Sequence, residues 1–340
     1  MKNLVKRVLA GSGLPALWRW RHRNDPLILM YHGVIADEDW WDWGTADMVS
    51  ASAFREHLDF FRRRYRVVPL KVVADALSGN PASLPPRTLV ITFDDGYRNS
   101  LVHALPALEA FDMTATLFVT TGFIDETTDL WWLALKRCLV TAQRTGDTVR
   151  LGDLGTWTIA SPQDAATCYR SALAQLKTVT AEERQALLDR LHEDVPEAPE
   201  PFGGAYWPAT WDEIRALHQA GMEIGAHTVT HPILSRETPE DANREIADSV
   251  ARVREQTGAE EVPFSYPNGM PEDFTQADVE AVREAGCYAA VAGFPGSNRS
   301  RDTLYALRRT SVSGHHTPAS LELDTCGMGP GLRQVFRPRG

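Results

Sequence analysis

Two adjacent carboxylates, Asp94 and Asp95, end an apolar run in the segment LVITFDDGYRNS, residues 89–100. The apolar and β-branched residues before them predict a buried strand. Two buried negative charges side by side are unfavourable unless a cation or a proton lies between them. The pair therefore indicates a site that holds a cation, and other parts of the sequence must supply the remaining ligands.

Two histidines, His227 and His231, are ligands of the right kind at the end of another apolar run, MEIGAHTVTH. If the chain turns helical after this strand, the His-x-x-x-His spacing puts both imidazoles on one face. Two neutral imidazoles and one carboxylate leave coordination positions open for water and substrate, as a catalytic zinc ion requires. One aspartate can then bind the metal while the other remains beside it as a base.

Two further apolar runs end in polar residues that fit the same candidate site. His32 closes LILMYHG, and PFSYPNG brings Tyr266, Pro267, Asn268 and Gly269 to the end of its strand. Taken alone, each motif has a common structural explanation, since Asp-Asp-Gly and Tyr-Pro-Asn-Gly favour turns and His-x-x-x-His arises by chance. Their joint position at the ends of separate predicted strands is much harder to explain in that way.

The elements that must position these residues alternate between helix and strand. Helical patterns with a threonine at the N-cap and a glycine at the stop, such as 210–221 and 238–258, are each followed by a short apolar run. About seven or eight such runs predict a parallel sheet, and we expect an α/β fold with a distorted or incomplete (β/α) barrel of about seven strands. In these barrels the chemistry lies at the carboxyl ends of the strands, so one rim should carry all of these residues.

Residues 125–205 interrupt the alternation and predict an insertion that caps the barrel mouth. The segment contains LWWLALKRCLV, a helix-like stretch and a proline-rich return, VPEAPEPFGG. Its Trp131 and Trp132 either stack on a substrate or form a small core within the insertion. The predicted organisation is a basic N-terminal segment (1–26), a barrel (27–124 and 206–320), the insertion (125–205) and a C-terminal tail (321–340).

Charge and composition narrow the class of partner. The chain of 340 residues has a formal net charge of −10, and no basic stripe dominates beyond the N-terminus, so a nucleic-acid partner is not expected. The first 24 residues carry six Lys and Arg side chains and no acidic one, which fits either peripheral contact with an anionic membrane or a solvated helix at the domain edge.

Location is predicted from the same N-terminal segment and from the cysteines. Glycines and a proline interrupt the apolar run after the basic start, so no secretory signal is predicted. We therefore expect a cytoplasmic protein, with membrane association at the inner face. The 4 cysteines lack paired spacing and are expected to be free thiols in a reducing compartment.

Together the motifs resemble those of polysaccharide deacetylases with the NodB-homology domain, carbohydrate esterase family 4. TFDDGY at 92–97 is similar to the first motif of the family, and HTVTH at 227–231 to the second. The resemblance runs from about residue 27 to 312, without the insertion. LILMYHGV makes the chain more similar to the branch that includes bacterial exopolysaccharide and biofilm-polysaccharide N-deacetylases.

The resemblance implies a role for each matching residue. Asp94 is implied as the catalytic base, and Asp95, His227 and His231 as ligands of one divalent metal ion; zinc is expected, and cobalt, nickel or manganese fit the same donors. The implied substrate is an N-acetylhexosamine unit of a bacterial polysaccharide or its lipid-linked precursor. The metal would activate a water and polarise the acetamide carbonyl, and Asp94 would take the water's proton. Backbone N–H groups of the turn 266–269 are expected to stabilise the oxyanion.

The sequence departs from the family pattern at two points. The third motif lacks the arginine that many members use to pair with the base, and Arg309 or Arg308 can replace it from another strand. The general acid is also open. His315 and His316 lack the leucine that precedes the family's usual histidine, and His32 is expected in the site with or without a proton-transfer role.

Two other functions fit the sequence. A metal-dependent amidohydrolase of a small non-sugar amide would have a closed, Arg-lined pocket, whereas a Trp-rich insertion beside a long groove favours a sugar substrate. An inactive carbohydrate-binding protein is the other alternative. The presence of Asp94 beside a complete ligand set argues against it, because a binding protein has no need of a base beside a metal.

Overall fold

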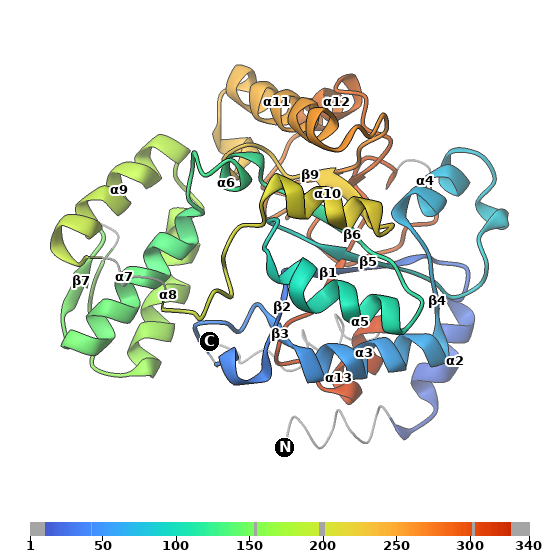
Figure 1. The fold of residues 1–340 in the computed structure, drawn as a ribbon, viewed down its shortest axis with the longest axis horizontal. Helices are drawn as coiled ribbons and strands as arrows, with labels where there is room; N and C mark the ends of the chain where they lie inside the picture. The colour runs from blue at the N-terminus through green and yellow to red at the C-terminus, as the bar shows by residue number, and fades with distance from the viewer. Residues whose placement is uncertain (1–10, 42, 153–154, 197–200, 301–302, 328–340) are drawn as a thin grey trace.

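The computed structural model describes residues 11–41, 43–152, 155–196, 201–300 and 303–327, and its centre is a parallel sheet (Figure 1). Seven strands form its main path: β1 (Leu27–Tyr31), β5 (Thr88–Phe93), β6 (Thr116–Val119), β9 (Glu223–Ala226), β10 (Phe264–Ser265), β11 (Ala290–Val291) and β12 (Thr310–Ser311). Their order across the sheet is β11–β10–β9–β6–β5–β1–β12, with every pair parallel. A further short strand, β4 (Arg66–Val67), pairs with the start of β5.

The two ends of this path meet through a single bridge. Val291 of β11 pairs in parallel with Leu307, which lies just before β12. The ring is thus closed by one isolated contact and not by a continuous ladder, and the distorted (β/α) barrel of about seven strands predicted from the sequence is confirmed.

The register of the central strands brings their carboxyl ends to one rim. Leu27 lies opposite Leu89 and Tyr31 opposite Phe93, so β1 and β5 end together. All residues of β5 are buried, because one face points into the barrel and helices cover the other. The residues that follow these two strands therefore start side by side.

The barrel helices begin and end at residues suited to those positions. Thr210 and Glu213 form a capping box at the start of α10, and α11 begins after the N-cap Thr238 and ends at Gly258, whose φ is 71°. The helices around the barrel are α3 (Ala51–Arg64), α4 (Leu70–Ser78), α5 (Leu105–Ala110), α6 (Thr121–Ile124), α10 (Trp211–Gln219), α11 (Pro239–Thr257) and α12 (Gln276–Glu284). Shorter elements are the pair β2 (Val34–Ile35) and β3 (Val49–Ser50), the π-helical turn Ser100–Ala104, and 3-10 turns at Asp37–Asp39, Pro81–Ser83 and Leu234–Arg236.

The segment predicted as an insertion forms a separate group of elements at one side of the barrel (Figure 1). It consists of α7 (Trp131–Thr145), the antiparallel pair β7 (Thr148–Arg150) and β8 (Thr156–Thr158), α8 (Pro162–Leu176) and α9 (Ala181–Asp194). These elements share a hydrophobic core of their own, which includes Trp131, Leu139 and Leu188.

The two ends of the described chain pack against each other beneath the barrel. Helix α13 (Pro318–Thr325) contacts α3, so the boundary predicted between residues 320 and 321 falls inside a buried helix. Glu322 of α13 pairs with Arg19 of α2 (Leu14–Arg21) and with Arg64 of α3, at 2.8 and 3.1 Å. All four cysteines are buried free thiols. Among the residues described, no helix has both the length and the apolar character to cross a bilayer.

Candidate active site

The Asp-Asp-Gly motif reverses the chain at the end of β5. The Asp94 N–H still continues the sheet, donating to the carbonyl oxygen of Tyr31 at 3.0 Å. Asp95 then adopts a left-handed conformation with φ 75°, which Asp tolerates better than most residues. Gly96 follows with φ 91°, and a Cβ there would lie 2.8 Å from the Ile124 side chain. This turn gives the two adjacent carboxylates different partners.

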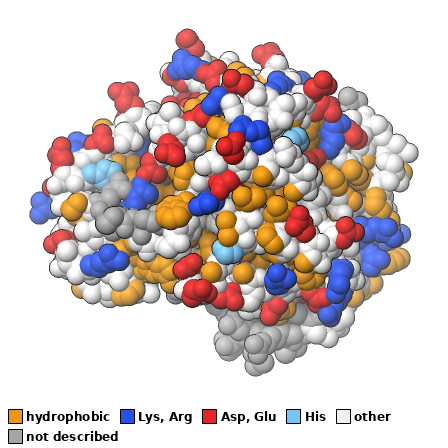
Figure 2. Space-filling model, viewed as in Figure 1, with side chains coloured by type: hydrophobic (Ala, Val, Ile, Leu, Met, Phe, Trp, Pro, Cys, Tyr) orange, Lys and Arg blue, Asp and Glu red, His pale blue; other side chains and the backbone are white. Residues whose placement is uncertain are grey.

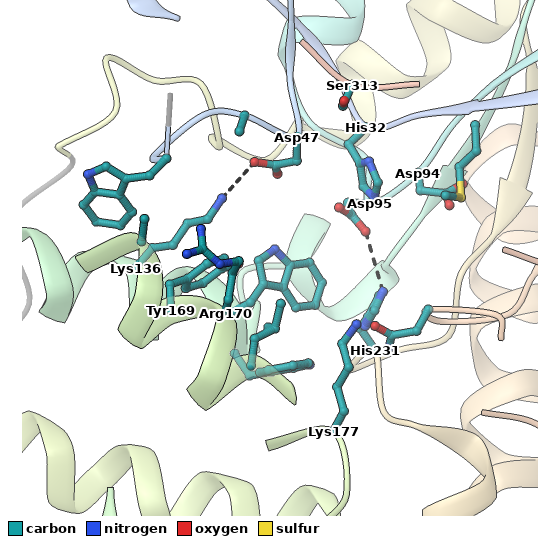
Figure 3. A pocket seen from close by; sticks show the side chains of 18 of the residues that line it. His32, Asp47, Asp94, Asp95, Lys136, Tyr169, Arg170, Lys177, His231 and Ser313 are labelled. Carbon is teal, nitrogen blue, oxygen red and sulfur yellow. Dashed lines mark hydrogen bonds and ion pairs between the residues drawn. The ribbon is translucent and has the colours of Figure 1, made fainter. Parts of the chain in front are cut away.

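Asp95 meets both predicted metal-ligating histidines. Its Oδ1 lies 3.7 Å from the Nε2 atoms of His227 and His231, and Figure 3 shows Asp95 and His231 facing each other in the cavity. The three ligand atoms lie within 4.8 Å of one another, and all three residues are buried. The Oδ2 of Asp95 is buried without a hydrogen-bond partner among the described residues. Two imidazoles, a carboxylate and an unsatisfied carboxylate oxygen fit a bound divalent metal.

The protonation states also suit metal binding. The Nδ1 of His227 donates to the Ser265 carbonyl oxygen at 2.7 Å, which directs Nε2 toward Asp95. Burial and the neighbouring His227 hold the pKa of His231 well below its usual value, so this ring is neutral. Burial raises the pKa of Asp95, although His32 and His227 oppose this shift.

The loop that carries the two histidines is not helical, so the helical turn expected between them is wrong. Thr228 and His231 have φ values of 64° and 58°, which no right-handed helix contains. Glu245 of α11 holds the loop from outside by accepting the N–H groups of Val229 and Thr230 at 2.8 and 2.9 Å. Glu245 was not predicted as a residue of the site, because nothing in the local pattern of α11 indicates this contact.

Asp94 forms a two-pronged ion pair with Arg309. The guanidinium donates to Oδ1 at 2.7 Å and to Oδ2 at 2.8 Å, and its other N–H groups reach Thr92, Ser265 and the carbonyl oxygen of Ala292. The side chain of Arg309 is only 1% exposed, and each of its five N–H donors has a partner within the protein. Burial alone would raise the pKa of Asp94, but the charge of Arg309 holds it below its usual value.

The choice between the two arginines is thereby resolved. Arg308 points away from the ion pair, with its guanidinium 5.6 Å from the ring centre of Phe294. Arg309, the neighbouring residue, is the one that reaches Asp94. Adjacent residues of an extended chain point to opposite sides, so only one of them can enter the barrel.

The histidines considered as general acids lie in different places. His32 follows β1, and it lines the cavity next to Asp95 (Figure 3). His315 also lines the cavity and packs edge-on against Trp40, with ring centres 5.6 Å apart. The Nε2 of His316 is instead 3.0 Å from a carboxylate oxygen of Asp324, and His316 does not line the cavity. The geometry leaves His32 and His315 as candidates.

The Tyr-Pro-Asn-Gly turn reaches the cavity at one residue. Tyr266 is buried against Phe274, its hydroxyl donates to the Tyr305 carbonyl oxygen, and its N–H is taken by Val291. Pro267 has no N–H group, and the N–H of Gly269 donates to Pro267 at 2.6 Å. Of the four residues, Asn268 alone lines the cavity, and its amide nitrogen has no partner among the described residues. The role expected of this turn in stabilising the oxyanion stays a prediction, although the N–H groups of Tyr266 and Gly269 already have partners within the protein.

The cavity lies between the barrel rim and the insertion and has a volume of about 510 Å³. The ring of Trp132 packs on His231 with centres 4.4 Å apart, so the insertion touches the candidate metal site directly. Trp131 belongs to the core of the insertion and also borders the cavity. The expectation that these tryptophans form a core within the insertion is confirmed, and stacking on a substrate stays a prediction for the side that borders the cavity.

At the carboxyl ends of the barrel strands, a buried Asp–His–His cluster lies beside a carboxylate that is paired with an arginine. This arrangement is typical of hydrolases that use a metal. The family model for polysaccharide deacetylases matches residues 82–290, more than half of the chain. The chain therefore belongs to the polysaccharide deacetylase family. Deacetylases of this family are metal-dependent, and the residues of the cluster fit such an ion.

Comparisons with individual proteins agree with this assignment. A putative polysaccharide deacetylase of Bacillus subtilis (strain 168), YxkH, is 28% identical over 104 residues, which are 31% of this chain and 36% of YxkH. The alignment thus spans about a third of that relative. The Streptococcus pyogenes deacetylase PplD, solved with acetate, aligns with a TM-score of 0.57 and 19% identity over 89% of this chain and 98% of PplD.

Two further solved structures share the fold. IcaB from Ammonifex degensii aligns with a TM-score of 0.55 and 18% identity, covering 90% of this chain and 97% of IcaB. The deacetylase domain of BpsB from Bordetella bronchiseptica aligns with a TM-score of 0.52 and 19% identity, covering 84% and 95% of the two chains. At these identities the structural likeness shows the fold.

Proposed function

We propose that the protein removes N-acetyl groups from N-acetylhexosamine units of a bacterial polysaccharide or its lipid-linked precursor, releasing acetate and leaving a free amine. The observation that supports this proposal most directly is the division of the Asp-Asp pair. Asp94 is held ionised by Arg309, whereas Asp95 faces His227 and His231. One carboxylate is thus available as a base directly beside a ligand set.

Asp95, His227 and His231 would hold the metal. Zinc suits two imidazoles and one carboxylate with positions left open, and cobalt, nickel or manganese fit the same donors. When bound, such an ion lowers the pKa of a water and polarises a carbonyl oxygen. Asp94 accepts the proton of the attacking water, because its pairing with Arg309 keeps it ionised.

The remaining residues of the site act on the acetamide. Asn268, whose amide is unpartnered at the cavity wall, is placed to donate a hydrogen bond to the carbonyl oxygen as it gains negative charge. His32 or His315 would donate a proton to the leaving nitrogen, since both border the cavity.

The walls of the cavity favour a sugar over a small acid amide. Trp43, Trp131 and Trp132 border it, and its volume of about 510 Å³ lies within the range of small-molecule sites. Aromatic faces offer a sugar ring large apolar contact areas at low entropic cost. The likeness to the IcaB and BpsB deacetylase folds further supports a glycan substrate.

The decisive experiment measures acetate release from a panel of N-acetylated glycans, with elemental analysis of the same preparation. We expect acetate release that stops on chelation and returns when zinc is added. A metal-loaded, folded preparation that releases no acetate from any glycan, yet hydrolyses a small non-sugar amide, would overturn the proposal.

We also propose that α2 contacts an anionic membrane surface, as at the inner face of the cytoplasmic membrane. Leu14, Leu17, Trp18 and Trp20 of this helix are between 45% and 61% exposed. Figure 2 shows Lys and Arg side chains gathered at the right-hand edge of this face, over the region of α2 and β4 in Figure 1. Apolar side chains beside cations are typical of helices that lie in a lipid interface. The other basic residues of the segment, Lys2, Lys6 and Arg7, lie outside the described residues.

Vesicle binding tests this surface. We expect the double substitution Leu17→Ser with Trp20→Ser to weaken cosedimentation with phosphatidylserine vesicles, because these side chains would lie among the lipids. Val72→Ser is the matched control, since Val72 is an exposed apolar side chain elsewhere. High salt should weaken binding further, since each cation near such a surface contributes about 1 kcal/mol. Equal binding by all three proteins would contradict the proposal.

A further inference from the structure

Helix α8 of the insertion has two distinct faces. One face packs in the core of the insertion and consists of Ala165, Cys168, Ala172 and Leu176. The opposite face lines the cavity and consists of Gln163, Ala166, Arg170, Leu173 and Lys177, which follows the last helical residue. Steps of three and four residues place each set on one side of a helix. The cavity face of α8 therefore borders the active site, and its polar residues Gln163, Arg170 and Lys177 do not belong to the core of the insertion.

This wall carries more positive charge than its neighbours compensate. Lys136 of α7 is matched, because its Nζ lies 2.9 Å from a carboxylate oxygen of Asp47. Arg170 donates to the Thr167 hydroxyl at 3.2 Å, and no carboxylate within the described part of the chain pairs with it. Lys177 likewise has no ion-pair partner among the described residues. The two unpaired cations of the wall are thus Arg170 and Lys177.

Lys177 is not an ordinary surface lysine. Figure 3 shows its side chain extending from the end of α8 toward His231. Its side chain is partly buried in the cavity wall, unlike that of the exposed Arg170. A partly buried cation without a partner is unfavourable, so a ligand that supplies negative charge here would gain from it.

The carboxylates of the barrel rim cannot serve as that partner. Asp94 is already matched by Arg309, and Asp95 belongs to the metal-ligand cluster. A negative charge that pairs with the exposed Arg170 and the partly buried Lys177 would therefore come from a ligand. Because Lys177 lies beside His231, it must come from a group close to the acetamide that is hydrolysed.

We propose that the cavity face of α8 is a subsite for a negatively charged group of the glycan, a carboxylate or a phosphate, next to the N-acetylhexosamine that is deacetylated. This inference rests on the proposed function, since it places the sugar at the Asp95–His227–His231 cluster. Arg170 provides a planar fork suited to the oxygen pairs of either group, and Lys177 provides a point charge. The substrate is then an acidic polysaccharide or a sugar phosphate, and not a neutral chain of N-acetylhexosamine.

The test compares two oligosaccharides that differ only in charge. One alternates N-acetylhexosamine with hexuronic acid, and the other is the same oligomer after reduction of its carboxyl groups to alcohols. We expect kcat/KM to be at least about tenfold higher for the acidic oligomer, the size of effect typical of a hydrogen bond to a charged group. A second pair, an N-acetylhexosamine phosphate ester and the free sugar, distinguishes phosphate from carboxylate as the favoured anion.

Variants connect this preference to α8. Lys177→Met and Arg170→Gln should each reduce the ratio of kcat/KM for the charged substrate to that for its uncharged counterpart several-fold, and Lys177→Arg should restore most of this ratio. Arg190→Gln is the matched control, because Arg190 is an exposed cation on α9 that does not line the cavity. Raising the salt concentration should shrink the advantage of the wild-type protein.

The outcomes separate this inference from the proposed function. Acetate release with equal rates on the charged and uncharged members of both pairs overturns the subsite alone. If Lys177→Met lowers kcat/KM equally for the charged and the uncharged substrate of a pair, the subsite is also overturned, because the lysine would then serve the reaction itself. If no glycan yields acetate, the proposed function fails. Binding of the same oligomers to the metal-loaded Asp94→Asn variant, with and without Lys177→Met, then decides whether an anionic group is preferred.

Discussion

At the barrel rim Arg309 uses all five of its donors on partners from the strands, whereas Arg170 and Lys177 of the insertion border the same cavity without a carboxylate partner in the described part of the chain. At the rim, Asp94 has its partner in Arg309 and Asp95 belongs to the metal-ligand cluster, whereas the two cations of the insertion wall have no such partner among the described residues. On the proposals above, the rim holds the groups that act on the amide, and the wall offers two cations, the exposed Arg170 and the partly buried Lys177, to a ligand. Changes at the rim should therefore alter kcat or metal content, and changes at the wall should alter the choice of substrate.

The largest effect is expected from the two neighbouring aspartates of the rim. Asp94→Asn should keep the metal and lower kcat by about a hundredfold to ten-thousandfold, because an amide cannot accept the proton of the attacking water. Asp95→Asn should lose metal instead, since it removes a charged ligand. Elemental analysis and acetate release on both variants make the comparison. Metal loss in Asp94→Asn with retention in Asp95→Asn would reverse the two roles.

The next effect concerns the stability of the rim. Arg309→Met leaves the buried carboxylate of Asp94 without its partner, and the loss of one member of a buried pair costs about 3–5 kcal/mol of unfolding free energy. Arg308→Met is the matched control, because the neighbouring Arg308 contacts Phe294 outside the ion pair. Chemical denaturation measures both. Similar losses in the two variants would show that the ion pair with Asp94 is not the source of this stability.

A smaller effect should distinguish the two histidines at the cavity. His32→Ala is expected to lower kcat by at least about tenfold with little change in melting temperature or metal content, since His32 lies beside Asp95. His315→Ala provides the comparison, because His315 borders the cavity from the segment after β12. A loss confined to His315→Ala would move the proton-transfer role to that residue. If His32→Ala instead melts early but turns over normally per folded molecule, His32 is a structural residue.

The smallest effect tests the junction between the two regions. Lys136 of α7 reaches Asp47 at 2.9 Å and the hydroxyl of Tyr206 at 2.6 Å, so it connects the insertion to the barrel. Lys136→Met should raise KM by roughly a few-fold and leave metal content unchanged, because it loosens the wall and not the ligands. Arg144→Gln, an exposed cation at the end of α7, is the control. A drop in metal content in Lys136→Met would show that the two regions are not separable.

Much of the rim could be predicted because its signals are local. The carboxylates of Asp94 and Asp95 directly follow an apolar run, and the caps at Thr210 and Thr238 begin the helices that the structure contains. In a parallel barrel, strand ends meet at one rim, so the joint position of His32, the aspartates and the His227 loop followed from the alternation of elements alone. The turn 266–269 was expected to offer its backbone N–H groups to the oxyanion, but which part of a turn borders a cavity depends on its tertiary neighbours, and of its four residues Asn268 borders the cavity.

The sequence by itself determined the order of strands and helices, the ligand types and the family, because each depends on residues close together in the chain. Only the tertiary structure decided between Arg308 and Arg309, since their sequence contexts are equivalent and just one side of the strand faces the barrel interior. It also decided that α8 builds the wall opposite the metal ligands, and which face of this helix packs in the core of the insertion. Contacts between elements far apart in the chain depend on how the insertion packs on the barrel, and no local pattern of residues encodes that packing.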